Sequence, residues 1–197
     1  MRKLLSLLLI LLVFTGVLFA EELPGTATLN LATIVAEQVY HGFFSSLESI
    51  SFDEDQAVNN TVSGVAPNAS NVDFGYYALY INLPTQVKVG FTLNSLTTTA
   101  GDDLWYVPYK LSISQAGQDG VRFGESFFTA KTFGSDSTPT VGGNDPLASL
   151  GGDVLTTSGS GNGYIALKLT ASFNSGNLEL IPSGSYSGSI VASITTP

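Results

Sequence analysis

The chain has 197 residues and a formal charge of −9, with 16 acidic side chains against seven Lys and Arg and a single His. It contains no cysteine, which excludes disulfides, thiolate chemistry and Cys-based zinc sites. Because the basic residues are few and scattered, they cannot form the clustered cationic surface that phosphates require, and this excludes nucleic-acid binding.

The first 20 residues have the three parts of an export signal. Arg2 and Lys3 form a positive start, residues 4–19 are almost unbroken apolar, and Ala20 is a small residue before the expected cleavage point. The apolar run is short for a bilayer span and no second one follows, so we expect no transmembrane helix after cleavage. The pattern predicts an exported protein of the periplasm, the cell surface or the extracellular medium.

Residues 21–34 are expected to form an N-terminal strand ahead of the body of the protein, residues 35–197. Side chains alternate between Thr26 and Ile34, and one modestly apolar face is formed by Ala27, Leu29, Leu31 and Thr33. The next segment, residues 35–50, fits either a short helix or an extended chain. Residues 49–52 are expected to form a short strand, and a loop with an acidic cluster follows.

The body reads as a series of strands, because apolar and polar residues alternate with a period of two in 86–94, 105–113, 163–173 and 186–194. In the strand expected at 72–83 both faces are partly apolar, which suits a central strand or one with an aromatic outer face. Pro108 lacks a backbone donor, which predicts an edge strand or a bulge there. Further strands are expected in 121–133 and 178–181, and a hairpin loop at 116–120.

The Gly- and Ser-rich segment 134–162 is predicted to be a long surface excursion. About eight or nine strands at these turn spacings predict an all-β fold, an Ig-like antiparallel β-sandwich.

No pattern of reactive side chains indicates an enzyme, a metal site or a cofactor site. His41 is the only candidate for a triad or a His-metal site, and a surface or capped histidine is the simpler interpretation. The acidic clusters 53–55 and 102–103 fail the EF-hand spacing and are interpreted as solvated loop acids. We therefore predict no catalytic residue, no metal ligand and no cofactor.

Aromatic residues concentrate on neighbouring predicted strands. Exposed aromatic rings can stack on sugar rings, so the candidates for glycan binding are Tyr76, Tyr80, Trp105 and Tyr106. Packing within the sheet is the alternative interpretation, because aromatic residues favour strands.

The two ends of the mature chain resemble subunits of bacterial pili of the chaperone–usher type. Residues 182–194 resemble the last strand of those subunits, with Gly184, Tyr186 and alternating apolar residues, and residues 25–34 resemble their N-terminal extension. The resemblance implies a sandwich that lacks one strand, with the gap filled by a neighbour's N-terminal strand. It names Ala27, Leu29, Leu31 and Thr33 as donor-strand residues, and a second copy, a homologous subunit or a chaperone as partner.

The function predicted first is a non-enzymatic structural subunit of a surface or periplasmic assembly. Residues 26–34 also fit the first strand of a complete sandwich, which would leave a self-contained carbohydrate-binding or adhesive module as the alternative. A second alternative is a small outer-membrane β-barrel, which also has alternating strands.

Overall fold

The computed structural model describes the body of the protein in segments, residues 37–52, 59–67, 69–120, 122–123, 127–159, 161–174 and 176–196. The expected signal peptide (residues 1–20), the expected N-terminal strand (residues 21–34) and the acidic cluster 53–55 lie outside these residues. Within the described part, no helix is long and apolar enough to cross a membrane.

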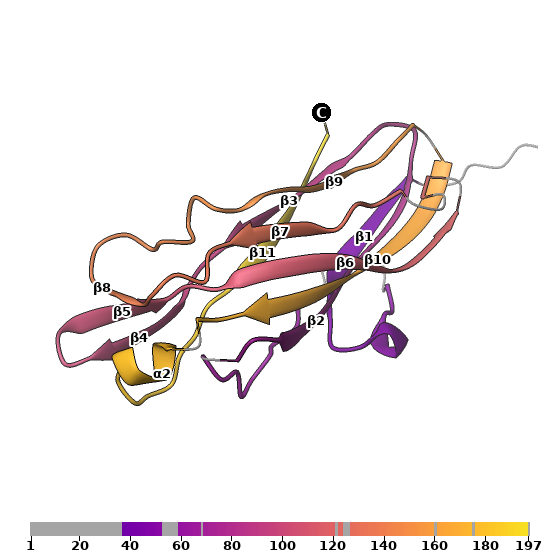
Figure 1. The fold of residues 1–197 in the computed structure, drawn as a ribbon. Coiled ribbons are helices and arrows are strands. Elements are labelled where there is room, and N and C mark those ends of the chain that lie inside the picture. Colours follow the sequence, from indigo (N-terminus) through magenta and orange to yellow (C-terminus); the bar gives the residue numbers. More distant parts are fainter. Residues whose placement is uncertain are drawn as a thin grey trace, which may run out of the picture. The chain divides into compact units, whose positions relative to one another are not determined.

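The larger of three antiparallel sheets, sheet A, has the strand order β1-β2-β10-β6-β7 (Figure 1). Its strands are β1 (Gln38–Phe44), β2 (Val72–Leu83), β10 (Gly161–Ser172), β6 (Lys110–Gly120) and β7 (Lys131–Gly134). Long strands in this sheet follow from the β-branched and aromatic residues that the sequence places at alternate positions.

Two smaller sheets complete the body. Sheet B has the order β11-β3-β9, with β11 (Ile190–Thr195), β3 (Lys88–Leu93) and β9 (Gly152–Thr156). Sheet C has the order β4-β5-β8, with β4 (Leu96–Ala100), β5 (Asp103–Val107) and β8 (Thr140–Val141). The described helices are one turn each, the 3₁₀-helix η1 (Leu47–Ser49) and α2 (Asn177–Leu180).

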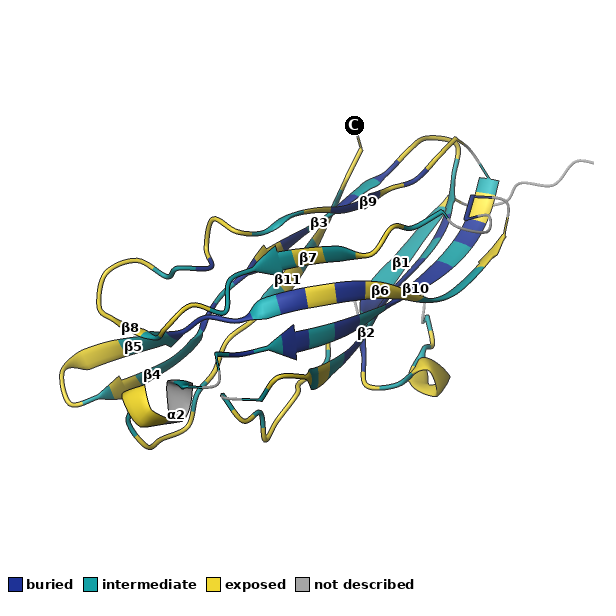
Figure 2. Cartoon of the chain, in the orientation of Figure 1, coloured by how far each residue is buried: buried dark blue, intermediate teal, exposed yellow. Residues whose placement is uncertain are grey.

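Sheets A and B pack face to face around one hydrophobic core. Tyr77 of β2 meets Phe91 of β3 edge to face at 5.1 Å between ring centroids, and both side chains are buried. Figure 2 shows buried and exposed residues alternating along the first half of β6, as expected for a strand with one face on the core. These features confirm the predicted all-β sandwich.

Five expectations of local structure differ from the fold. Residues 49–52, expected to be a strand, are the end of η1 and a segment outside the strands, and in the expected strand region 121–133 the described residues form a strand only from Lys131 onward. The predicted strand 105–113 is divided between β5 and β6, because Pro108 ends the hydrogen-bonded ladder. The expected hairpin loop 116–120 is instead the end of β6. Residues 178–181 were expected to be extended, yet α2 begins after Gly176 and contains most of them.

The segment 134–162 also differs from the predicted surface excursion. It contains β8 and β9, and three of its apolar side chains, Leu147, Val154 and Leu155, are buried in the core. Local composition could not reveal this, because the burial depends on partners far away in the sequence. Eleven strands are therefore described instead of the expected eight or nine.

Candidate functional site

The two long sides of the sandwich differ. On one side the edge strands β7 and β9 are bridged, since the Lys131 ammonium group donates to the Asp153 carbonyl at 2.8 Å. The ring of Phe133 also covers Gly152 there, at 3.2 Å from the position of an added β-carbon. This side of the core is closed by the chain itself.

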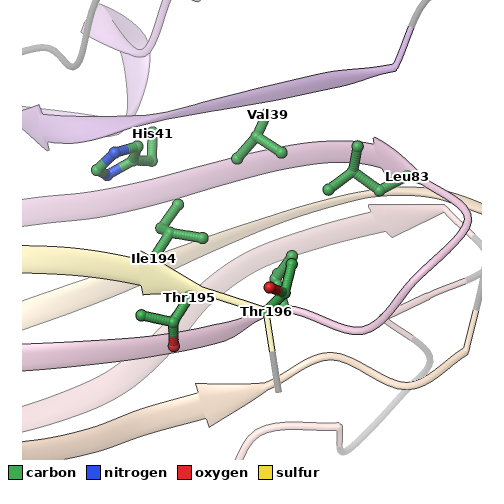
Figure 3. Close-up of a pocket in the computed structure, with 7 residues that line it drawn as sticks. Val39, His41, Leu83, Ile194, Thr195 and Thr196 are labelled. Carbon is green, nitrogen blue, oxygen red and sulfur yellow. The ribbon is translucent and has the colours of Figure 1, made fainter.

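The opposite side is hollowed between the edge strands β1 and β11. A groove of about 720 Å³ lies there, and it is lined by Val39, His41, Leu83, Val87, Ile194, Thr195 and Thr196. Figure 3 shows the side chains of Val39 and His41 from β1 near that of Ile194 from β11. Among the described residues, β1 pairs only with β2 and β11 only with β3. Within the described part of the chain, each strand therefore has one edge without a partner strand.

Burial falls towards this groove. The inward residues of β2 and β3, such as Leu79, Ile81 and Val89, are fully buried. The inward residues of β1 and β11, by contrast, are only half-buried, namely Val39, His41, Phe43, Ile190, Ala192 and Ile194. Completing the burial of such apolar surface would stabilise the protein by about 25 cal/mol per Å². The groove is thus a place where an additional strand would gain both hydrogen bonds and apolar contacts.

His41 gives the groove a polar element. It lies between Val39 and Phe43 on the inward face of β1, beside Tyr77, with 5.9 Å between ring centroids. Its Nδ1 atom and the hydroxyl group of Tyr77 are buried, and neither has a hydrogen-bond partner among the described residues. Desolvation lowers the pKa of His41, which therefore stays neutral at neutral pH, and it raises the pKa of Tyr77. His41 thus lines the groove, whereas Tyr77 lies beneath it in the core.

The residues that were predicted for glycan stacking do not form one surface. Tyr76 and Tyr80 lie on one face of β2 in sheet A, directed away from the core. Trp105 and Tyr106 are consecutive residues of β5 in sheet C, so they point to opposite faces of that sheet. The predicted donor residues Ala27, Leu29, Leu31 and Thr33 lie outside the described residues.

Groups that could hold a metal ion are not found where the structure describes the chain. Within that part, no three His, Asp or Glu side chains converge. Asp102 and Asp103 are exposed at the turn between β4 and β5. The three ion pairs of the described residues are solvent-exposed. Lys88–Asp153, at 2.7 Å, and Lys168–Asp73 join neighbouring strands, and Lys110–Asp136 joins β6 to the segment after β7.

Sequence reasoning missed most of the groove. The sequence of residues 35–50 fits either a helix or an extended chain. Within it, however, Val39, His41 and Phe43 alternate with polar residues and glycine, as in a strand. That alternation was a usable signal for β1. Nothing local, however, could have indicated that β1 and β11 flank the same opening.

No family model matches the chain, and neither a curated protein nor a solved structure matches it.

Proposed function

We propose that this protein is an exported, non-enzymatic structural subunit that self-assembles when an N-terminal strand of one copy enters the groove of another. The observation that supports the proposal is the half-buried core between β1 and β11, whose facing edges have no partner strand among the described residues. A strand placed there can pair with both edges, in the manner of β-strand addition. Its alternate side chains would then complete the core.

Residues 26–34 have the chemistry that the groove requires. Ala27, Leu29, Leu31 and Thr33 are small or medium side chains on one face of the expected strand, with polar residues between most of them. Peptide hydrogen bonds would give affinity, and the alternating side chains would give specificity.

A second copy is the favoured source of the strand. For the chain's own strand to fold back along β1, residues 33–38 would have to form a tight turn. This segment, Thr-Ile-Val-Ala-Glu-Gln, contains no Gly, Asn, Asp or Pro, and three of its residues are β-branched. Tight hairpin turns favour the absent residues and disfavour β-branched ones. An extended segment would instead carry the strand away from its own groove.

The proposal is tested by mixing two variants of the full chain after export. Leu29→Arg damages the donor strand, and Ile194→Arg blocks the acceptor groove. We expect each variant alone to be monomeric in size-exclusion chromatography with light scattering. Their mixture should form a dimer, because each damaged copy still supplies the other with an intact element, and the wild-type chain should form longer assemblies.

Two neighbouring substitutions serve as controls. Asn30→Arg changes the other face of the expected donor strand, and Val191→Arg changes the solvent face of β11, where Val191 is 52% exposed. Both should assemble as the wild type does. A wild-type chain that stays monomeric at high concentration, or a mixture that forms no dimer, contradicts strand exchange.

A further inference from the structure

The outer face of sheet A carries a row of three tyrosines, one on each of three adjacent strands. Tyr40 of β1 is opposite Tyr80 of β2, which is opposite Tyr164 of β10. The rings of Tyr40 and Tyr80 lie nearly parallel, at 6.0 Å and 22°. We call these three residues the tyrosine ladder. All three side chains are half-buried, so part of each ring faces solvent.

The ladder is supported from one side by a short segment that folds over the sheet. The row next to it consists of small residues, Gly42, Ala78, Ala166 and Gly117, and leaves a trough. Phe52 fills the trough and packs against all three tyrosines, with at most 6.3 Å between its ring centroid and each of theirs. A capping box between Ser46 and Ser49 fixes the turn that precedes Phe52. The ladder is therefore supported by the ring of Phe52.

A row of amides lies on the other side of the ladder. Gln38, Asn82 and Asn162 are in register on the same three strands, and Asp119 of β6 is opposite Tyr164. No hydrogen bond to another described residue uses the hydroxyl groups of Tyr40, Tyr80 and Tyr164 or the amides of Gln38 and Asn162. Aromatic rings, hydroxyls and amides thus alternate over one face without serving the core between the sheets.

This combination defines the chemistry of the ligand. Rings with a polar tip bind molecules that have both apolar faces and hydroxyl groups, and sites of this kind use a few placed polar groups to fix orientation. Sugar rings have C–H faces and equatorial hydroxyls. Among the described residues in register with the ladder, the charged side chain is that of Asp119, and the chain carries a net charge of −9, so both disfavour an anionic ligand.

We propose that the tyrosine ladder binds a neutral polysaccharide, laid across β1, β2 and β10 with its hydroxyls directed at the amide row. Adjacent strands are separated by about 4.8 Å, so the ladder spans about 10 Å from first to third strand. That length exceeds one sugar ring, which favours a chain over a monosaccharide. The site is separate from the groove, because β1 presents Tyr40 and His41 to opposite faces of sheet A.

The test is native affinity electrophoresis of the exported full chain in gels that contain hydroxyethyl cellulose, galactomannan, laminarin or glycogen. We expect at least one of these neutral polysaccharides to retard the protein. Tyr80→Ala, at the centre of the ladder, should weaken the retardation at least tenfold. Asn162→Arg is a second variant at an exposed position, and it should weaken binding without affecting the fold even if Tyr80→Ala does not fold.

Trp105→Ala is the matched control, because it removes a half-exposed aromatic ring from sheet C. It should leave the retardation unchanged. Three results overturn the proposal: no retardation by any neutral polysaccharide, retardation only in gels that contain the polyanion alginate, or a loss in Trp105→Ala that equals the loss in Asn162→Arg.

Discussion

Asp145 is expected to stabilise the loop before β9 strongly. Its carboxylate accepts hydrogen bonds from the Ser95 backbone N–H (2.9 Å), the Ser95 hydroxyl (2.6 Å) and the Leu147 N–H (2.8 Å). Ser95 and Leu147 are fully buried. Asp145→Ala would therefore leave buried donors without an acceptor, and each such donor costs about 1–3 kcal/mol. Together these losses predict a destabilisation of about 3 kcal/mol or more.

The measurement is urea unfolding of Asp145→Ala beside Asp136→Ala. Asp136 lies in the same stretch of chain, but its carboxylate pairs with Lys110 at 3.1 Å with both side chains about 40% exposed. An exposed pair contributes only about 0–1 kcal/mol. Asp145→Asn keeps one acceptor oxygen and should lose about half as much as Asp145→Ala. Equal losses in the two alanine variants would refute the role given to Asp145.

Three further predictions concern the rest of the body. Gly75→Ala should cost about 3 kcal/mol or more in urea unfolding, since φ is +85° and the new β-carbon would overlap the Phe44 carbonyl oxygen of β1. Gly101→Ala, with φ +64° but open space, should cost only about 1 kcal/mol. Thr157→Val should lower the free energy of unfolding by about 2 kcal/mol, because the buried hydroxyl accepts hydrogen bonds from the Val87 backbone N–H at 2.9 Å and from the Arg122 guanidinium. Its control is Thr156→Val, at an exposed position, which should change stability by under about 0.5 kcal/mol. Burial lowers the pKa of His41 from its ordinary 6.5, so the unfolded chain binds the proton more readily and stability should fall as pH drops below about 6.5, by at most about 1.4 kcal/mol per pH unit. Thermal unfolding between pH 7.5 and 5.5 checks this, and His41→Gln should have a flatter profile; equal slopes would contradict it.

Much of the sandwich could be predicted from alternation alone. The strands predicted at 72–83, 86–94 and 163–173 correspond to β2, β3 and β10, because each has a buried face whose period of two is visible in the sequence. In the segment 134–162 the same reasoning failed. Leu147 is buried because Asp145 binds Ser95, which is 50 positions earlier in the chain. Such a contact leaves no local pattern.

The candidate sites show the same division. Alternation indicates which residues of β1 share a face, but it cannot show which other strands contribute to that face. The ladder can be recognised only from the strand register that aligns Tyr40, Tyr80 and Tyr164. The groove can be recognised only from the position of β11 opposite β1. The predicted aromatic set kept Tyr80 but missed Tyr40 and Tyr164, since neighbours across a sheet are set by strand order.

Strand β1 connects the two proposals, and its geometry makes them separable. His41 faces the groove, while Tyr40 belongs to the ladder on the other face. Substitutions at these adjacent positions therefore act on opposite faces of one sheet. Deletion of β1 would remove both sites and distinguish nothing. Ile194→Arg and Asn162→Arg change different sheets, so their effects should be independent. Ile194→Arg should abolish assembly and leave retardation by the polysaccharide intact, and Asn162→Arg should do the reverse. If both variants lost both properties, the groove and the ladder could not be separate sites.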